Sequence, residues 1–136
     1  MGRRVNMRNT EGYMDLTVHD ALLRVLKQQK QKYRPLVYIC TDETAMNKAT
    51  VLKLRICCRW VVKHDGIPIA PGLYFPQFMS VTTSADQELQ ARFRKILLDL
   101  CEELWVFGEP SDGMKAEIAR AQRKQKCVRF ISHPKD

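Results

Sequence analysis

Glu117 is the residue whose surroundings in this sequence are best suited to chemistry. It follows a turn-forming segment, residues 109–113, which comes directly after the wholly apolar run 104–107. An aromatic and β-branched run of this kind is typical of a strand buried on both faces. The segment after the turn has helical spacing, so Glu117 lies one turn into a helix and shares a face with Gly113. Because glycine has no side chain, space is left above the carboxylate where a sugar could fit.

The turn before Glu117 also offers a place for an anion. Ser111 or Asp112 can cap the helix, and the first turn of a helix carries backbone N–H groups that have no intrahelical partner. Since the turn follows a strand of a parallel sheet, it lies at the carboxyl edge, where open α/β sheets bind ligands. A plainer interpretation stays open, in which Glu117 is a solvated side chain that pairs with Arg120 or Lys124.

Two more segments follow predicted strands and reach the same edge of the sheet. The strand over residues 35–40 runs into residues 41–43, a polar turn ahead of a long helix. The strand over residues 67–71 contains two prolines, which place it at the edge of the sheet because each removes a backbone donor. It leads to residues 72–85, which read as a long loop rich in aromatic side chains. Such loops tend to bind ligands, so these aromatics either stack on a base or cover the end of the core.

Composition and charge exclude several classes of protein. The 136 residues suit one core, and a net charge of +8 favours anionic partners without choosing among nucleotides, nucleic acid and acidic proteins. The five cysteines lie in apolar runs without the spacing of a zinc site, which indicates reduced core residues of a cytoplasmic protein. No apolar run reaches the roughly 18 residues that a membrane span needs. The Ser-His-Asp order, the P-loop and the G-x-G-x-x-G fingerprint are all missing, and we expect neither a metal nor a cofactor.

The remaining elements complete an α/β pattern. Residues 1–34 are expected to form a basic arm and a helix that opens with a capping box at residues 17–20. Residues 35–136 then alternate strands and helices and end in a strand over residues 127–131. Right-handed crossovers predict a parallel sheet of four to five strands in the order 2-1-3-4, with helices on both faces.

Three of the predicted helices carry apolar stripes, which we expect to pack against other surfaces. The N-terminal helix has Val18, Ala21, Leu22, Val25 and Leu26. The helix after the first strand, closed by Asp65 and Gly66, has Val51, Leu54, Cys58, Val61 and Val62. The helix over residues 86–101 has Leu89, Phe93, Ile96, Leu97 and Leu100.

The order and spacing of five motifs resemble the nucleoside 2-deoxyribosyltransferase-like superfamily. The motifs are VYIC at residues 37–40, IPIAP at 67–71, LYFPQFM at 73–79, CEELWVFG at 101–108 and SDGMKAEI at 111–118. A segment of the form EGY-x-D-x-T, residues 11–17, is similar to the N-terminal segment of small bacterial and phage members.

The resemblance implies a flavodoxin-like, Rossmannoid fold and a retaining glycosyl mechanism. In that superfamily a glutamate on the helix after the third strand attacks the anomeric carbon of a nucleoside, and Glu117 matches it. The resulting sugar ester is resolved by water or by a second base. Ser111, Gly113 and Met114 match the loop that holds the sugar or its 5′-phosphate. Members commonly complete the site from a neighbouring subunit, so the resemblance also implies a homo-oligomer.

The sequence departs from the superfamily pattern at two places. Many relatives have Ser-Pro-Tyr where this chain has Thr41, Asp42 and Glu43, and Pro-His-Leu where this chain has Pro71, Gly72 and Leu73. We therefore expect Asp42 or Glu43 to act as the acid that protonates the leaving base. The same carboxylates would repel an anionic phosphate.

The function that we expect is cleavage or transfer at the N-glycosyl bond of a nucleoside or nucleotide, with Glu117 as nucleophile. The alternative is a non-catalytic member that binds a nucleotide-like ligand or a protein partner, such as a phage regulator of nucleotide signalling. A third hypothesis, a basic nucleic-acid-binding protein, rests on charge alone and is disfavoured because aromatic residues are not interleaved with the basic ones. No membrane partner is expected, since no apolar run is long enough to span a bilayer. The expected ligand-binding residues are Thr41, Gly72, Tyr74, Phe75, Phe78, Gly108, Ser111, Asp112, Gly113 and Met114.

Overall fold

The computed structural model describes residues 16–132. The chain divides between Tyr33 and Arg34 into an N-terminal unit and an α/β unit. The basic arm predicted at the N-terminus and residues 11–15 of the EGY-x-D-x-T segment lie outside the described residues.

The N-terminal unit contains one helix, α1, Leu16–Gln31. Since the helix begins at Leu16, Thr17 lies inside it and is not the N-cap that we predicted. The apolar stripe is present but solvent-exposed, because Leu22, Val25 and Leu26 are each 49% exposed. The stripe is thus an exposed apolar face of the N-terminal unit, and the surface that it packs on remains a prediction.

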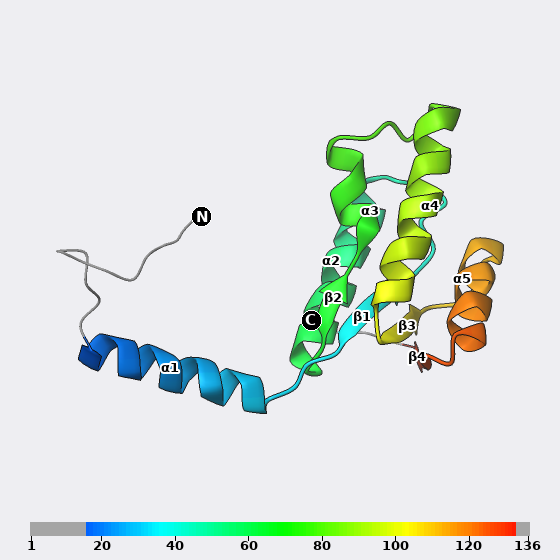
Figure 1. Ribbon diagram of the computed structural model, residues 1–136. Helices are drawn as coiled ribbons and strands as arrows, with labels where there is room; N and C mark the ends of the chain where they lie inside the picture. Colours follow the sequence, from blue (N-terminus) through cyan, green and yellow to red (C-terminus); the bar gives the residue numbers. More distant parts are fainter. Residues whose placement is uncertain (1–15, 133–136) are drawn as a thin grey trace. The chain divides into compact units, whose positions relative to one another are not determined.

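The α/β unit is built on a four-stranded parallel sheet with the predicted order β2-β1-β3-β4. The strands are β1 Leu36–Cys40, β2 Ile67–Ile69, β3 Glu103–Phe107 and β4 Cys127–Ile131 (Figure 1). β2 is an edge strand, as its prolines predicted, and β1 and β3 are central. The topology is flavodoxin-like.

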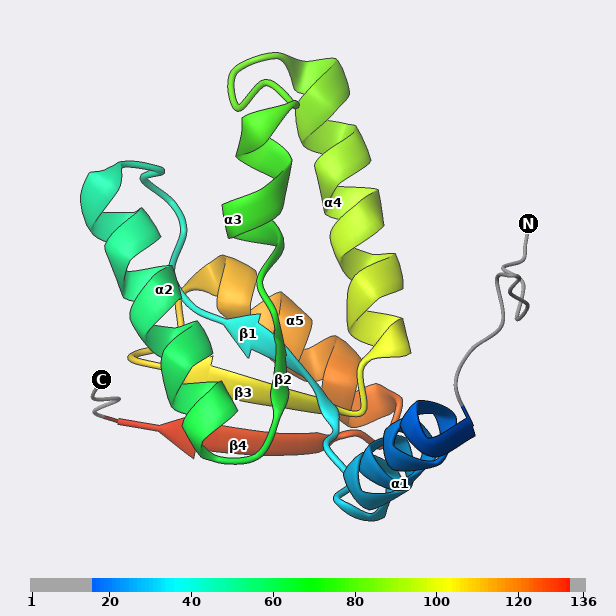
Figure 2. The same ribbon diagram turned by 90° about the vertical axis from the view of Figure 1, so that its left-hand side faces the viewer.

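Helices cover both faces of this sheet (Figure 2). One face is covered by α2, Lys48–Lys63, which connects β1 to β2. The other is covered by α4, Ser84–Leu100, and α5, Asp112–Arg123, which lead into β3 and β4. Between β2 and α4 the chain forms two short helices, α3 Pro71–Tyr74 and η1 Phe75–Gln77.

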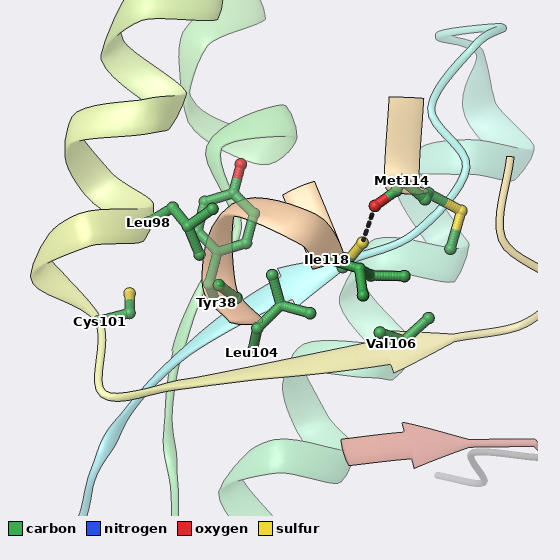
Figure 3. Packing of buried hydrophobic residues seen from close by; sticks show 9 residues of the cluster. Tyr38, Leu98, Cys101, Leu104, Val106, Met114 and Ile118 are labelled. Carbon is green, nitrogen blue, oxygen red and sulfur yellow. Dashed lines mark hydrogen bonds between the residues drawn. The ribbon is translucent and has the colours of Figure 1, made fainter. Parts of the chain in front are cut away.

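The two central strands alternate their side chains between two hydrophobic cores, which explains their continuous apolar sequence. Tyr38 and Leu104 point toward α4 and α5, where they pack with Leu98 and Ile118 (Figure 3). Val37, Ile39, Trp105 and Phe107 point toward α2 and pack against Leu54, Cys57 and Val61.

The faces of two helices differ from our predictions. In α2 Leu54 and Val61 are buried as predicted, but Cys57 is buried in place of Cys58, and Val62 is exposed. In α4 only Leu98 is fully buried, and Leu97 packs against the core as predicted. The other predicted inward residues, Leu89, Phe93, Ile96 and Leu100, are 38 to 66% exposed. A single helix can carry two apolar stripes. In α4 the more continuous stripe in the sequence is not the one that contacts the sheet.

The segment predicted as a long loop, residues 72–85, is helical in its first part. α3 and η1 occupy residues 71–77, and α4 begins at Ser84. Pro71 and Pro76 stand in the first turns of these short helices, where a missing backbone N–H costs nothing. The irregular part is therefore shorter than the loop that we predicted.

The cysteines are free thiols, and Cys40, Cys57 and Cys101 are buried as expected. Cys127 is exposed on the edge strand β4, which corrects its assignment to the core. None of the described helices is long and apolar enough to cross a membrane.

Candidate functional site

The strand order creates a crevice at the carboxyl ends of β1 and β3. β1 leads to α2 on one face of the sheet, whereas β3 leads to α5 on the other, so the two connections separate above neighbouring strands. Ligand sites of open α/β sheets form at such points. A pocket of about 560 Å³ lies here, lined by residues 41–44, by one side of α4 and by the first turns of α5.

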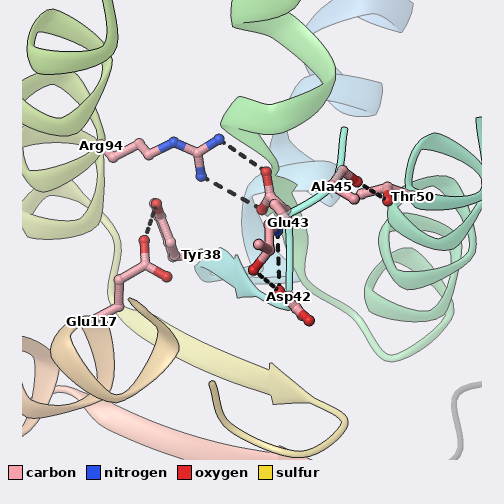
Figure 4. A network of polar contacts seen from close by, with 8 residues as sticks. Tyr38, Asp42, Glu43, Ala45, Thr50, Arg94 and Glu117 are labelled. Atoms are coloured by element: carbon pink, nitrogen blue, oxygen red, sulfur yellow. Dashed lines mark hydrogen bonds and ion pairs between the residues drawn. The ribbon is translucent and has the colours of Figure 1, made fainter. Parts of the chain in front are cut away.

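Glu117 lies in this pocket and is held by Tyr38. Tyr38 extends from the centre of β1 beneath α4, and its phenol donates a hydrogen bond of 2.6 Å to Oε2 of Glu117 (Figure 4). The tyrosine side chain is fully buried, so its ring has no freedom to leave this position. The hydrogen bond therefore fixes the carboxylate relative to the sheet.

The surroundings of Glu117 act on its protonation in opposite directions. Burial raises the pKa of Glu117, while the Tyr38 hydrogen bond, the positive charge of Arg94 and a hydrogen bond with Cys40 lower it, and the net result is a raised pKa. Burial and the nearby Glu117 charge raise the pKa of Tyr38 well above its ordinary value. The phenol therefore keeps its proton and acts as the donor.

Arg94 connects α4 to the turn after β1. Its guanidinium donates to both carboxylate oxygens of Glu43, at 2.9 and 3.5 Å (Figure 4). The carboxylate reaches this position because Gly72 has no side chain, since a Cβ at residue 72 would overlap Glu43 Oε1. Burial lowers the pKa of Arg94, but its bonds to Glu43 outweigh that effect and the pKa lies above the ordinary value. Arg94 therefore remains charged.

The other residues of the β1 turn have mainly local roles. Asp42 is exposed, and its Oδ1 accepts hydrogen bonds from the backbone N–H and the hydroxyl of Thr44, which lower the pKa of Asp42. Thr41 is buried, and its hydroxyl donates to the carbonyl of Phe107 at 3.5 Å, which joins the ends of β1 and β3. Both residues line the pocket.

The start of α5 forms the opposite wall. Ser111 is the N-cap, with its hydroxyl accepting from the backbone N–H of Met114 at 3.5 Å, as the sequence indicated. Asp112 begins the helix, and Gly113 faces open space, with nothing within 4 Å of where its Cβ would be. The space above Glu117 that we inferred from the missing side chain is therefore present.

With this geometry in place, comparison with known families gives one match. Residues 35–131 match a family that is described as a domain of unknown function, DUF7768. The chain belongs to the DUF7768 family. The matched range contains all four strands and the whole pocket, so the DUF7768 domain is the unit that carries the candidate site. No curated protein matches the chain.

Not all of the predicted site residues meet in the pocket of the DUF7768 domain. Glu117, Asp42, Glu43, Thr41, Ser111, Asp112, Gly113 and Met114 line it. Gly72 lies behind Glu43, and Gly108 forms a turn with φ of 87° near Lys53, outside the pocket. The aromatic residues also lie elsewhere, which corrects our expectation that residues 72–78 reach the same crevice. Tyr74 and Phe75 line a separate apolar groove of about 460 Å³, and Phe78 packs on Tyr74.

Two residues that sequence reasoning missed are central to this site. Tyr38 was assigned only to the buried strand, although a lone hydroxyl in an apolar strand signals a buried partner. Arg94 was overlooked because the wrong face of its helix was assigned to the interior. It lies one turn before Leu98, the residue of α4 that is buried.

The pocket brings charged side chains of both signs together. Within residues 16–132, no group of three or more His, Cys, Asp or Glu side chains is placed to hold a metal ion. The lining combines Asp42, Glu43, Asp112 and Glu117 with three cations, of which Arg94 and Arg120 are already engaged with carboxylates. The DUF7768 domain thus presents a pocket near charge balance, although the whole chain is strongly basic.

Proposed function

We propose that the DUF7768 domain breaks the N-glycosyl bond of a nucleoside or nucleotide through a covalent sugar ester on Glu117. The observation that carries the proposal is the hydrogen bond between Tyr38 and Glu117 inside the pocket. A carboxylate that is half-buried, fixed by a phenol and open on one side has the features of a nucleophile. The resemblance to nucleoside 2-deoxyribosyltransferase-like proteins supports the same position.

In the first step, Oε1 of Glu117 attacks the anomeric carbon of the sugar. The bond from that carbon to the base nitrogen breaks, its electron pair goes to the base, and the base takes a proton from water. In the second step, water attacks the same carbon, the ester bond breaks, and the carboxylate of Glu117 is restored while the proton goes to solvent. The configuration at the anomeric carbon is inverted in each step, so the overall reaction retains it. If a second base replaces water in the second step, the sugar is transferred to that base.

Tyr38 supports both steps from one position. Its hydrogen bond engages Oε2 of Glu117 and orients the carboxylate, and Oε1 is the oxygen that attacks the sugar in this proposal. When the ester breaks, negative charge returns to the carboxylate, and a preorganised donor stabilises that charge. Because Tyr38 keeps its proton, it serves as a donor throughout.

The lining charges favour a substrate with little negative charge. Four carboxylates face the pocket, and Lys95 is the lining cation without an ion pair among the described residues. A triphosphate would be repelled, whereas the sugar of a nucleoside carries no charge. The backbone N–H groups at the start of α5 can accommodate one phosphate, so nucleosides and nucleoside monophosphates are the proposed substrate class.

The direct test is a chromatographic screen for released base. Wild-type protein is incubated with nucleosides, nucleoside 5′-monophosphates and dinucleotides, and free base is quantified against protein-free controls. Release from at least one nucleoside or monophosphate, increasing linearly with protein concentration, supports the proposal. Intact substrates across the panel, together with measurable binding of one of them, would favour the second candidate below.

A specific observation favours a second candidate, a binding domain without turnover. Neither carboxyl group expected to act as the acid is placed to give up a proton. The ordinary pKa of an aspartate is far below neutral pH and Thr44 lowers that of Asp42 further, so Asp42 has no proton to give. Glu43 accepts hydrogen bonds from Arg94 on both of its oxygens. Without an acid, a poor leaving base stays attached, and the domain would hold a nucleotide-like ligand or serve as a protein-binding module. Calorimetric titration with the same panel distinguishes this candidate from the enzyme.

A further inference from the structure

α2 differs from the other helices of the α/β unit in the sign of its charges. It carries Lys48, Lys53, Arg55, Arg59 and Lys63 and contains no Asp or Glu. α4 and α5 both combine acidic and basic residues. Among the helices of the α/β unit, α2 is therefore the one with a large net positive charge.

Four of these cations share the solvent-facing side of α2. The buried residues Leu54, Cys57 and Val61 face the sheet. Lys48, Arg55, Arg59 and Lys63 follow one another at spacings of seven, four and four residues, which places them together on the opposite side of the helix. We call these four residues the α2 cationic stripe.

The side chains of the α2 cationic stripe are available to a partner. All four are exposed. The ion pairs found among residues 16–132 use Arg34, Arg94, Arg120 and Lys124, and none uses a residue of the stripe. Four unpaired cations in a row repel one another, so an anion that neutralises them gains favourable energy.

We propose that the α2 cationic stripe binds the phosphate backbone of a nucleic acid duplex, without reading its bases. From Lys48 to Lys63 the helix rises about 22 Å at 1.5 Å per residue. One strand of a duplex carries a phosphate about every 3.4 Å along its axis, so this length spans about six phosphates. A linear row of cations on a rigid helix matches a linear row of phosphates.

Other anionic partners fit this surface less well. A membrane-bound amphipathic helix inserts its apolar face into the lipid, but the apolar face of α2 is buried against the sheet. Protein interfaces have an apolar centre that is depleted in charge, whereas this face offers only Leu52 and Val62 beside four cations. The net charge of the chain did not favour nucleic acid over other anionic partners. The position of four cations on one face of α2 does.

The inference is independent of the glycosyl chemistry proposed above. The pocket lies between the β1 turn, α4 and α5, whereas the stripe lies on the side of α2 opposite its buried residues. Duplex binding should therefore be unchanged in Glu117→Gln, and failure of either proposal leaves the other intact.

The test compares two variants that remove the same charge from different places. One is Arg55→Gln/Arg59→Gln/Lys63→Gln on the stripe. The matched control is Arg92→Gln/Lys115→Gln/Arg123→Gln, which replaces three exposed cations of α4 and α5 outside the pocket lining. Binding of a fluorescent mixed-sequence DNA duplex is measured by anisotropy at several salt concentrations, and circular dichroism verifies that both variants are folded.

If the stripe makes about four phosphate contacts, wild-type affinity should fall about 150-fold between 50 and 200 mM salt, from a slope of about −0.9 per contact. The stripe variant should lose most of this dependence and fall only about 4-fold over the same range, because about one contact remains. The matched control should behave as wild type. A second duplex of different sequence should bind within about 3-fold of the first, since phosphate contacts carry no base information.

Three results would overturn the proposal. Equal weakening of the stripe variant and the matched control would show that net charge, and not the stripe, attracts the duplex. Displacement of the duplex by polyglutamate of the same charge concentration would indicate an acidic protein partner. Binding to vesicles of anionic phospholipid in the absence of any duplex binding would indicate a membrane surface.

Discussion

The carboxylate of Glu43 lies where the side chain of any residue other than glycine at position 72 would have to lie. The bidentate contact with Arg94 depends on this arrangement, because it is Gly72 that lets Glu43 turn toward α4. The turn after β1, the start of α3 and the middle of α4 are thereby linked at one wall of the pocket.

Gly72→Ala should therefore displace Glu43 and destabilise the fold. Overpacking of this kind costs about 1–3 kcal/mol in the free energy of unfolding, which urea denaturation measures. The matched control is Gly113→Ala, where the new methyl group enters open space and φ is not positive. The control should leave stability unchanged or slightly raised. Equal destabilisation by the two variants would contradict the role assigned to Gly72.

Tyr38→Phe should raise the pKa of Glu117. The hydrogen bond from Tyr38 favours the charged carboxylate and partly offsets the effect of burial on the pKa of Glu117. When this hydrogen bond is lost, burial raises the pKa further. NMR titration of the Glu117 side-chain carboxyl measures this without any need for turnover. In an active enzyme the low-pH limb of the kcat/KM profile should move to higher pH as well. Tyr74→Phe, at an exposed tyrosine outside the pocket, is the control and should change neither.

Asp99→Asn should remove a contribution to the free energy of unfolding that depends on pH. Arg120 and Lys124 lower the pKa of Asp99 from 3.8 to about 2 in the folded chain. A lowered pKa means that the stabilisation is complete above the unfolded value and is lost as pH falls from about 4 through about 2. Urea denaturation at about pH 6 should show wild type to be more stable than the variant, and the difference should disappear near pH 2. A difference that does not depend on pH would show that the ion pair does not contribute.

Self-association remains a prediction, and the α4 surface indicates where it would occur. Ile96 and Leu100 are 56 and 66% exposed on one side of that helix, beside the apolar groove that contains Tyr74. Contiguous exposed apolar residues of this kind mark interaction surfaces. Light scattering at micromolar concentration should give a mass above the 15.8 kDa of one chain for wild type, and 15.8 kDa for Ile96→Lys/Leu100→Lys. Leu52→Lys, on α2, should keep the wild-type mass, and a monomeric wild type would contradict the prediction.

The sheet could be predicted from sequence because its strands are short, apolar and bounded by turn residues. The run from Leu104 to Phe107 and the prolines after Ile67 fixed the central and edge positions, and crossover handedness then restricted the order. The cap at Ser111 and the space above Gly113 were also predictable, because both follow from local chemistry.

The contacts that complete the site could not be predicted in the same way. Tyr38 and Glu117 are 79 residues apart in sequence, and Glu43 and Arg94 are 51 apart. Such pairs depend on which face of each helix meets the sheet, and the apolar pattern of α4 was ambiguous on this point. Because the face containing Ile96 was expected to be internal, nothing in the sequence pattern pointed to Arg94 or to its contact with Glu43.

Comparison of base release by wild type and Glu117→Gln tests the central claim most directly. The amide keeps the shape of the side chain but cannot form the sugar ester, so turnover should fall by at least about 1,000-fold. Calorimetry should show the same ligand bound by both proteins, and circular dichroism should show the same fold. Wild-type turnover in Glu117→Gln would contradict the assignment of Glu117 as the nucleophile.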